Sequence, residues 1–518
     1  MHLLPRSGNF GLGTWPLRRA RIAPDAPALS QGHRVVTWSQ LANRTARLTA
    51  ALTELGVVRG ERVAYLGPND LAIFETFFAT AQVGAVFVPL NTRLAAAELQ
   101  YMLRDCEPAV LVLDEAVGFE PTELVTGGVT RIVNKTDLDA LVEAHEPAAP
   151  LANLPLEDPA LFLFTSGTTG RAKAAMLTHS NIFWNTVNQL AHIDFLSTDR
   201  ALCVAPLFHS VGFGQITLPV LFKGGQVELL PKFDAAAMLE TIEQLKITGF
   251  AAVPTILQML AEHPSWNDTD LSSLRHVNYG GSPANERITR EWQRRGVTLQ
   301  QGYGMTEAGP GVLMASAEGG LDRPMAAGVP HVFTDIAHLA DDGHAVPVDN
   351  TPRELLIRGP HVFAGYWGRP EDSAAEVVDS EWFRTGDVLR FEDGWGYVVD
   401  RVKDVIISGA ENIYPAEVEA VLAAAPGVRS AAVVGIPDDR WGEVGLAYVE
   451  ALPGFELDPD EVLDYARSQL AKYKVPTQVH VLSELPRNAA GKVLRQELRL
   501  HTANPSDSSV AISPEGTP

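Results

Sequence analysis

The residues best suited to chemistry form a short run of small and hydroxylated side chains at positions 165–170, which Lys173 follows. Small side chains let backbone N–H groups approach phosphate oxygens, and a lysine adds positive charge nearby. The run does not fit the Walker A pattern, because the position five residues after Gly167 is Ala172 instead of glycine. A Gly/Ser/Thr cluster taken alone is also typical of a surface turn. We therefore predict a phosphate-binding loop, with a surface turn as the alternative.

The segments that must position this loop alternate between strand and helix. Residues 62–66 and 85–90 have the apolar composition of buried strands, and residues 70–82 between them have that of a buried helix. The same alternation returns over residues 201–253. Alternation of this kind is typical of a parallel sheet, so we predict α/β architecture through about Ser316.

The last third of the chain has a different pattern. Residues 354–399 form short alternating runs separated by Gly, Asp and Pro turns, which indicates a mostly antiparallel subdomain. A smaller α+β pattern follows. We expect an N-terminal domain over residues 1–400, a junction at 401–403 and a C-terminal domain over 404–501. Residues 502–518 are rich in Ser, Pro and Thr, and we expect a disordered tail.

Length and composition exclude several classes of protein. The chain has 518 residues, which is too long for one compact core. Hydrophobic residues make up 46% and charged residues 20%, as in an ordinary globular protein. The net charge of −22 would repel nucleic acid and anionic lipid, so we expect no nucleic-acid partner.

Cysteine content and hydropathy bear on the cellular location. Cys106 and Cys203 are the only cysteines, which leaves no disulfide framework and no Cys-rich metal site. Polar and turn-forming residues interrupt the most apolar window, Leu71–Leu90, so we expect no membrane span. The N-terminal residues lack the continuous apolar stretch of a signal peptide. We expect a cytoplasmic protein.

Further motifs follow the phosphate-loop run, each of them weak when taken alone. They are Pro206–His209, Tyr279–Ser282, Gly302–Glu307, Thr385–Asp387, Asp400–Asp404, Ser408–Pro415 and Pro486–Lys492. The ordered set resembles the adenylate-forming superfamily, which includes acyl-CoA synthetases, adenylation domains of nonribosomal peptide synthetases and firefly luciferase. The resemblance covers nearly the whole chain and is closest in pattern to bacterial AMP-forming fatty-acid and aryl-CoA ligases. It implies a large N-terminal domain of layered α/β sheets with an antiparallel subdomain, and a small mobile α+β C-terminal domain.

The resemblance implies a reaction in two steps, with ATP and CoA as co-substrates and Mg²⁺ as cofactor. A carboxylate attacks the α-phosphate of ATP and releases pyrophosphate, and a thiol then attacks the acyl adenylate and releases AMP. Negative charge accumulates at phosphorus in the first step, so a cation placed there is a natural catalyst. The catalytic residues that the resemblance implies are Lys492, His209, Thr306 and Glu307, with Glu307 also the Mg²⁺ ligand.

The resemblance also assigns the nucleotide site and the junction between the domains. Lys403 matches the hinge about which the small domain rotates after adenylation. The family normally has Pro before and Gly after the loop lysine, whereas Ala172 and Ala174 flank Lys173 here. The residues implied for ATP and AMP binding are Thr165, Ser166, Gly167, Thr168, Thr169, Gly170, Lys173, Gly280, Gly281, Ser282, Tyr303, Gly304, Asp387 and Arg401.

The acyl and CoA sites are assigned by the same resemblance. Amino-acid-activating relatives place an Asp near the motif Phe208–Ser210, which has none here, so an acid without an α-amino group is favoured. The acyl-pocket candidates, mostly apolar or small, are Trp184, Val211, Phe213, Thr255, Gly304 and Gly309. The CoA candidates are Ser408, Gly409, Ala410, Trp441 and Arg93.

The preferred hypothesis is therefore an AMP-forming ligase that joins a hydrophobic carboxylic acid to CoA. An acyl-AMP ligase that loads a carrier protein is the alternative, although the short segment 387–401 favours CoA. A catalytically dead nucleotide-binding protein would be expected to lose Lys492, Glu307 or Asp387, and all three are present. The acid can be aliphatic, aromatic or polycyclic. A homodimer is one option that the sequence does not test.

Overall fold

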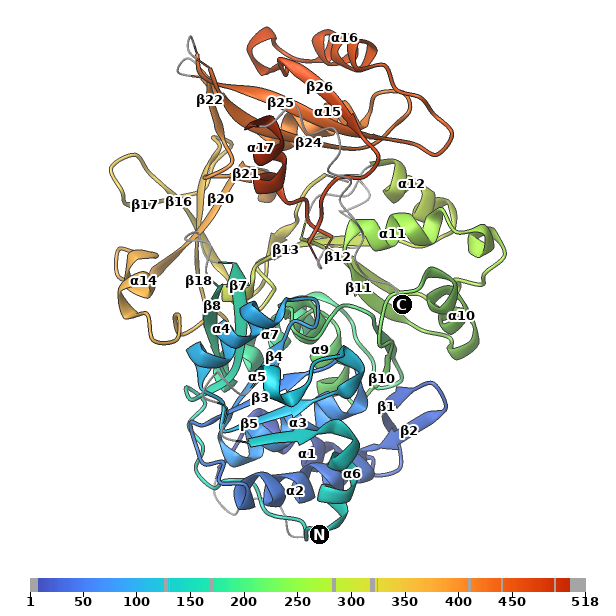
Figure 1. Cartoon of the computed structure of the whole chain (residues 1–518), viewed down its shortest axis with the longest axis vertical. Coiled ribbons are helices and arrows are strands. Elements are labelled where there is room, and N and C mark those ends of the chain that lie inside the picture. The colour runs from blue at the N-terminus through green and yellow to red at the C-terminus, as the bar shows by residue number, and fades with distance from the viewer. Residues whose placement is uncertain are drawn as a thin grey trace. The chain divides into compact units, whose positions relative to one another are not determined.

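The chain forms two compact units, which are described separately (Figure 1). The first unit comprises residues 1–347, 356–384 and 394–396, and the second comprises 348–355, 385–393 and 397–518. The structure is a computed structural model. It describes residues 8–124, 129, 131–166, 172–281, 286–316, 322–323, 325–408, 411–438, 441–488 and 491–503.

Part of the antiparallel segment belongs to the second unit, and the expected boundary at residues 401–403 stays a prediction. Within that unit, the N–H of Val402 donates to the carbonyl of Gly386. The N–H of Gly386 in turn donates to Glu354 Oε1 over 3.1 Å. These bonds connect residues 348–355 and 385–393 to the start of the C-terminal domain. The hinge at Lys403 stays a prediction.

The larger sheet of the first unit has nine strands in the order β15-β14-β13-β12-β11-β9-β10-β1-β2. The six strands from β13 to β1 are parallel, and antiparallel strands close both edges. The strands are β1 (Pro27–Gln31), β2 (Arg34–Thr37), β9 (Arg200–Cys203), β10 (Gln226–Leu229), β11 (Gly249–Ala252), β12 (His276–Tyr279), β13 (Leu299–Tyr303), β14 (Leu313–Met314) and β15 (Val329–Pro330).

A second sheet of the first unit has six strands in the order β6-β5-β3-β4-β7-β8. It is parallel except for the β7–β8 pair. Apolar side chains from both sheets and from α3 (Leu71–Val83) form one core. The strands are β3 (Arg62–Leu66), β4 (Val86–Leu90), β5 (Val110–Leu113), β6 (Arg131–Asn134), β7 (Pro159–Ser166) and β8 (Ala172–Thr178).

Every residue of α3 and β4 is buried, which confirms that the most apolar window is a core helix followed by a core strand. Asp70 caps α3 by accepting from the N–H of Ala72, and Gly84 ends it in the left-handed region. The other helices of this unit are α1 (Trp15–Ile22), α2 (Trp38–Glu54), α4 (Ala96–Cys106), α5 (Pro121–Leu124), α6 (Lys135–Glu143), α7 (His179–His192), α8 (Ser210–Gly214), α9 (Thr217–Lys223), α10 (Ala235–Leu245), α11 (Pro254–Ala261), α12 (Glu286–Arg294) and α14 (Pro370–Ala375).

The expected antiparallel subdomain is present as a sheet in the order β17-β16-β18-β20-β19, with β21 paired to β20. Strands β18 and β20 each carry residues of both units. The strands are β16 (Asp335–Leu339), β17 (Ala345–Val346), β18 (Arg353–Arg358), β19 (Val377–Val378), β20 (Trp382–Glu392) and β21 (Trp395–Arg401).

The rest of the second unit is a small α+β fold around the long pair β24 and β25. The expected tail begins at residue 502, but α17 continues through Ala503, and residues 504–518 lie outside the described chain. The elements are β22 (Ile406–Ser408), β23 (Glu411–Ile413), α15 (Pro415–Ala423), β24 (Val428–Asp438), β25 (Gly442–Ala451), α16 (Pro459–Gln469), β26 (Gln478–Leu482) and α17 (Arg495–Ala503).

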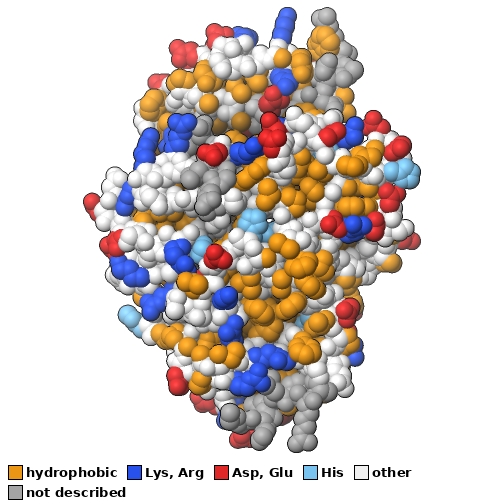
Figure 2. Space-filling view, turned by 180° about the vertical axis from the view of Figure 1, so that it is seen from behind, with side chains coloured by type: hydrophobic (Ala, Val, Ile, Leu, Met, Phe, Trp, Pro, Cys, Tyr) orange, Lys and Arg blue, Asp and Glu red, His pale blue; other side chains and the backbone are white. Residues whose placement is uncertain are grey.

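Two surface properties bear on the expected partners. No helix among the described residues is both long enough and apolar enough to cross a lipid bilayer. On the face drawn in Figure 2, basic and acidic side chains are interspersed, and apolar side chains gather between them.

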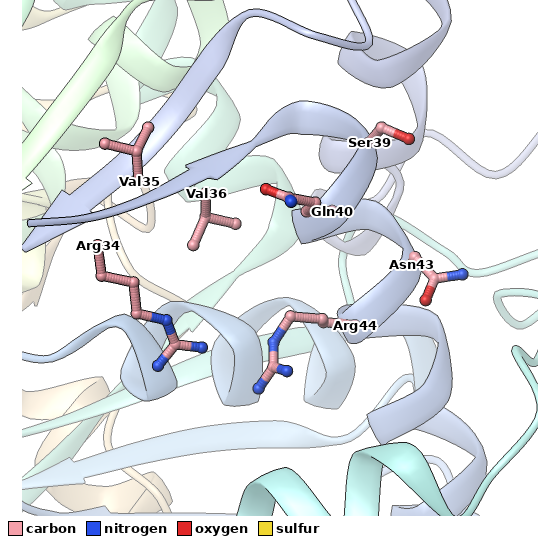
Figure 3. A pocket seen from close by; sticks show the side chains of 7 residues that line it. All are labelled: Arg34, Val35, Val36, Ser39, Gln40, Asn43 and Arg44. Carbon is pink, nitrogen blue, oxygen red and sulfur yellow. The ribbon is translucent and has the colours of Figure 1, made fainter.

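A polar hollow of about 490 Å³ lies beside β2 and the start of α2 (Figure 3). The side chains of Arg34 and Arg44 point toward the same side of it. Arg44 forms a two-pronged ion pair with Glu75, with nitrogen–oxygen distances of 2.6 and 2.9 Å, and it also contacts Asp139. Arg34 lies 4.0 Å from the same Asp139 carboxylate. These carboxylates offset the two guanidinium charges, so the hollow has little attraction for an anion.

The buried Arg44–Glu75 pair makes a testable contribution to stability. Glu75 is 2% exposed, so Glu75→Leu leaves the Arg44 guanidinium half-buried with only its more exposed partner Asp139. We expect the free energy of unfolding to fall by about 3 kcal/mol, measured by urea denaturation. Asp464→Asn, which removes the exposed Arg467–Asp464 pair, is the control and should change stability little. Equal effects of the two substitutions would contradict this role of the buried pair.

Candidate active site

The candidate motifs of the first unit converge at one edge of the nine-stranded sheet. Strands β9, β11, β12 and β13 are parallel neighbours, so their carboxyl ends meet at this edge. His209 follows β9, Thr255 follows β11 and Gly280 follows β12. The motif Gly304–Glu307 follows β13. The fold thereby collects segments that lie far apart in the sequence.

Gly280 and Tyr303 are two of the residues that the resemblance implies for ATP and AMP binding, and the resemblance places the adenine ring beside them. They lie at the ends of neighbouring strands. A β-carbon at Gly280 would lie 2.8 Å from the carbonyl oxygen of Gly302, so a side chain would collide with the backbone of the next strand. Gly281 has φ +84°, a conformation that favours glycine. Tyr303 is 9% exposed. Its contact with adenine stays a prediction, and Ser282 lies outside the described residues.

The predicted phosphate loop connects β7 and β8, which pair antiparallel with Thr165 opposite Lys173. A strand therefore follows the loop, whereas a Walker A loop leads into a helix. This difference explains why the Walker A spacing is absent. The structure does not describe Gly167, Thr168, Thr169, Gly170 or the side chain of Ser166, so those assignments stay predictions.

Glu307 is the best-defined polar group at the carboxyl edge. Its side chain is 7% exposed, and Oε1 accepts a hydrogen bond of 3.0 Å from the hydroxyl of Tyr366. The N–H of Phe363 donates to the Glu307 carbonyl over 2.8 Å, which connects the two loops through their backbones as well. Burial, together with the Glu307 charge, raises the pKa of Tyr366, so its hydroxyl stays protonated and remains a donor.

Lys173 is held on the other side of Tyr366. Its ammonium group lies 5.3 Å from the centre of the Tyr366 ring and 2.8 Å from a carboxylate oxygen of Asp372. The sequence motifs pointed to Lys173 and Glu307, but nothing in them pointed to Tyr366 or Asp372. In the sequence, Tyr366 stands out only as an aromatic residue after Gly365, and no neighbouring motif marks it as part of a site.

His209 lies at the start of α8, and its loop is anchored from the second sheet. Asn69 accepts from the N–H of Leu207 over 3.0 Å and donates to the carbonyl of Ala205 over 3.1 Å. Burial, with a smaller effect of the Arg93 charge, lowers the pKa of His209 to about 4. The imidazole is therefore neutral near pH 7. Its Nε2 is buried and has no hydrogen-bond partner among the described residues.

Arg93 was assigned to CoA, yet in the structure its charge acts on the ring of His209. Its side chain is exposed. The CoA assignment of Arg93 stays a prediction.

The acyl-pocket candidates separate into different surroundings. Phe213 is 2% exposed, and its ring packs against Phe74 and Phe77 at centroid distances of 5.8 and 5.1 Å, so core packing accounts for this side chain. A β-carbon at Gly304 would overlap the Pro310 carbonyl oxygen at 1.3 Å. This contact explains why the position is a glycine, and the place of Gly304 in the acyl pocket stays a prediction. Trp184, Val211 and Thr255 are partly exposed, as pocket-lining residues can be.

A row of buried amides on α7 was not anticipated from the sequence. Asn181 donates to the carbonyls of Pro360 and Val362 over 2.9 and 2.7 Å. Asn188 Oδ1 accepts from the N–H of Phe333 over 2.9 Å. The signal available in the sequence was three asparagines, at positions 181, 185 and 188, spaced to share one helix face.

Asn185, the middle amide of this row, joins two site segments. It donates to the carbonyl of Gly214 in α8 over 2.9 Å and accepts from the N–H of Gly311 over 3.3 Å. α8 begins directly after His209, and Gly311 lies four residues after Glu307. One side chain that is 1% exposed therefore fixes the loops of two predicted catalytic residues relative to each other.

The second unit brings together three of the assigned residues. Arg401 Nε lies 3.1 Å from Asp387 Oδ1, with Asp387 on β20 and Arg401 at the end of β21. Burial is the main cause that lowers the pKa of Lys492 to about 8, and the Arg401 charge lowers it further while the Asp387 charge opposes this. Asn488 holds the turn before Lys492 by accepting from the Lys492 N–H over 2.9 Å.

Two of the CoA candidates of the second unit, Ser408 and Trp441, lie at the ends of neighbouring strands β22 and β25. Ser408 pairs with Gly442, which is next in sequence to Trp441. Trp441 is 48% exposed, so it is a surface residue and not a core tryptophan. Lys403 is exposed as well, while Gly409 and Ala410 lie outside the described residues. The CoA contacts stay predictions.

Comparison with known proteins decides the family. Residues 17–367 match the model of the AMP-binding enzyme family, and residues 417–492 match that of the AMP-binding enzyme C-terminal domain. The chain belongs to the AMP-binding enzyme family. This confirms the resemblance to adenylate-forming enzymes and the expected α/β fold with a large and a small domain.

Several proteins similar to this family member are CoA ligases. A feruloyl-CoA synthase of Amycolatopsis sp. is 46% identical over 492 residues, covering 95% of this chain and 99% of the relative. A long-chain-fatty-acid–CoA ligase of Mycobacterium tuberculosis is 33% identical over 494 residues, covering 94% and 97%. The solved o-succinylbenzoate–CoA synthetase of Bacillus subtilis with its acyl-adenylate intermediate has a TM-score of 0.85 at 31% identity, covering 94% and 98%. The protein is accordingly an acid–thiol ligase of the AMP-forming type, with ATP and CoA as substrates.

The amide clamp of Asn185 can be tested directly. Asn185→Leu leaves the Gly214 carbonyl and the Gly311 N–H unpaired, so the loops of His209 and Glu307 lose their common anchor. We expect kcat/KM for acid-dependent pyrophosphate release to fall at least about 10-fold. Asn43→Leu, an exposed amide on α2, is the control. Full activity of a folded Asn185→Leu variant would show that the loops do not need this clamp.

Proposed function

We propose that this ligase activates a hydrophobic, aromatic carboxylic acid as its acyl adenylate and transfers the acyl group to CoA. The observation that carries the proposal is the buried Glu307 carboxylate, held by Tyr366 at the carboxyl edge where His209 and Thr255 also follow strands. The aromatic class is supported by the 46% identity to a feruloyl-CoA synthase over nearly the full length of both chains. An aliphatic acid is the second candidate because of the more distant fatty-acid relative.

The residues fit a bound Mg²⁺ ion. This hard cation prefers oxygen ligands and needs only one or two protein carboxylates when a triphosphate supplies the rest. Glu307 offers a buried carboxylate, and the described residues contain no group of three or more metal-ligating side chains. Glu307 would therefore hold the ion together with phosphate oxygens. When bound, the ion offsets negative charge on the triphosphate.

The remaining residues act on nucleotide and acid. Thr306 offers a hydroxyl to phosphate oxygens, and Asp387 accepts hydrogen bonds from the ribose hydroxyls. Neutral His209 and the nearby Arg93 charge favour the substrate carboxylate at the end of β9. Lys492 offsets the charge that builds up as the carboxylate oxygen bonds to the α-phosphorus and pyrophosphate departs.

Lys492 must move away from the acyl adenylate before a thiol can attack the carbonyl carbon of that adenylate. For this reason we expect the C-terminal domain to rotate about Lys403. The thiol sulfur then forms the thioester bond while the bond from the acyl carbon to the AMP oxygen breaks. Ser408 on β22 pairs with Gly442, the first residue of β25, and the exposed Trp441 directly precedes that strand, which supports a shared CoA-facing surface there.

The first test measures acid-dependent pyrophosphate and AMP release from MgATP, with and without CoA. The acids are a matched panel of aromatic, fatty and polycyclic carboxylic acids. We expect CoA-stimulated turnover with AMP as product, fastest for aromatic acids. Adenylate formation that CoA does not stimulate would favour a carrier protein as acceptor. The absence of turnover with every acid would contradict the proposed function.

The lowered pKa of Lys492 predicts the pH dependence of adenylation. A lysine with a pKa of about 8 is charged below that pH and neutral above it, so kcat/KM should fall as pH rises through about 8. In Lys492→Arg the cation persists, and this fall should disappear. In Lys492→Ala adenylation should be lost, while thioester formation from a supplied acyl adenylate is comparatively retained.

The exposed Lys246→Ala is the matched control for Lys492 and should keep the wild-type pH profile. Equal loss of both half-reactions in Lys492→Ala would refute the role given to this lysine. An unchanged pH profile in Lys492→Arg would show that another group causes the fall.

A further inference from the structure

The segment 364–367, which carries Tyr366, extends the six-stranded sheet at the outer edge of β8. The N–H groups of Ala364 and Trp367 each donate to a carbonyl of β8 over 2.9 Å. Tyr366 and Ala175 form an antiparallel bridge between these two bonds. Hydrogen bonds of this ladder type fix both the place of a residue and the face from which its side chain projects. The sheet therefore determines where the Tyr366 ring lies.

Further contacts hold the Tyr366 ring from its backbone and from its sides. The N–H of Tyr366 donates to Ser373 Oγ over 2.8 Å. The ring of Phe363 packs against the tyrosine ring in a T-shaped arrangement, with a centroid distance of 4.9 Å. The Lys173 ammonium lies 5.3 Å from the tyrosine ring centre. The hydroxyl of Tyr366 is thus presented from a ring that is fixed on several sides.

The fixed hydroxyl of Tyr366 orients one specific group, the carboxylate of Glu307. It donates to Glu307 Oε1 over 3.0 Å, and the N–H of Phe363 donates to the Glu307 carbonyl over 2.8 Å. The side chain and the backbone of Glu307 are therefore held by the same neighbouring segment. A hydrogen bond to one carboxylate oxygen restricts rotation of the carboxylate, and so fixes the direction in which both oxygens point. Hydrogen-bond partners that orient a metal-binding side chain typically change metal affinity or activity by about 10–100-fold.

We propose that Tyr366 is a positioning residue for adenylation, which orients Glu307 toward the metal ion that the nucleotide carries. The proposal rests on the proposed function, since it concerns the Mg²⁺ site assigned there to Glu307. Because Tyr366 acts through Glu307, its hydroxyl should matter for binding of the magnesium–nucleotide complex. The hydroxyl should not matter for binding of the nucleotide without metal.

The test uses Tyr366→Phe, which removes the hydroxyl and keeps the ring that contacts Phe363 and Lys173. The probe is α,β-methylene-ATP, which cannot release pyrophosphate, and its Kd is measured by isothermal titration calorimetry with Mg²⁺ and with EDTA. We expect the Kd with Mg²⁺ to rise about 10-fold and the Kd with EDTA to change less than about 2-fold. An unchanged Kd with Mg²⁺, or an equal loss of affinity in both conditions, would overturn the proposal.

A double-mutant cycle with Glu307→Ala shows whether the two residues act together. Without the Glu307 carboxylate, the Tyr366 hydroxyl has no oxygen to orient. Adding Tyr366→Phe to Glu307→Ala should therefore cause no further loss of affinity for the magnesium complex. A loss as large as that in the wild-type background would mean that the hydroxyl acts on another group, and the proposal would fail.

Tyr448→Phe is the matched control. The Tyr448 hydroxyl also donates a hydrogen bond of 3.0 Å, but to the carbonyl of Leu498 within the second unit. This variant should keep the wild-type Kd in both conditions. Thioester formation from a supplied acyl adenylate does not use the triphosphate, so Tyr366→Phe should retain it, which shows that the variant has folded. If Tyr366→Phe does not fold, Tyr366→Met, which also lacks the donor, must show the same difference between Mg²⁺ and EDTA.

The outcomes separate the two proposals. If no acid yields AMP with the wild-type enzyme, the proposed function fails, while the titration, which needs no acid, still decides the role of Tyr366. If acids react and Tyr366→Phe binds the magnesium complex as tightly as the wild type, only the positioning role fails. If the wild type binds the analogue equally well with Mg²⁺ and with EDTA, the metal assignment of Glu307 fails, and the positioning role fails with it.

Discussion

The site of the first unit depends on one constraint, which is that buried loop backbone must find hydrogen-bond partners. A parallel sheet leaves long loops at its carboxyl edge, and their N–H and C=O groups cannot all join the sheet. Here side-chain amides provide the missing partners. Asn185 joins the segments after His209 and Glu307, Asn181 holds the loop before Phe363, and Asn69 holds the loop before His209. Amides suit this task because each can donate and accept without introducing charge.

The same packing explains why the site contains so many glycines. Gly280, Gly304 and Gly311 each lie where a β-carbon would meet backbone or a polar side chain at less than van der Waals distance. At Gly304 the neighbour is the Pro310 carbonyl, so the glycine serves the fold of the loop. At Gly311 the neighbours are polar side-chain atoms of Gln189, Asn185 and His331, so the glycine lets the loop backbone pack closely against these side chains.

Much of the fold followed from the sequence because its determinants are local. The run at residues 62–66 forms β3 with the expected bounds, and the apolar window 71–90 forms α3 and β4. The membership of residues 348–355 and 385–393 in the second unit could not be read from the sequence, because it depends on contacts between distant segments. Phe213 resembled a pocket residue by its place after His209, yet its ring packs with phenylalanines of α3.

The sequence by itself determined three things. The order of the motifs determined the family, and the period of the hydrophobic residues determined the α/β class. The residue types determined which chemical groups are present in the site. Glu307, Asp387 and Lys492 could be named from their motifs alone. Only the tertiary structure decided which partners those groups have, including Tyr366 for Glu307 and Arg401 for Asp387. It also decided the surroundings of Gln189 and His331. Hydrogen bonding and desolvation depend on distances between atoms, and chain folding sets these distances between residues that sequence spacing leaves far apart.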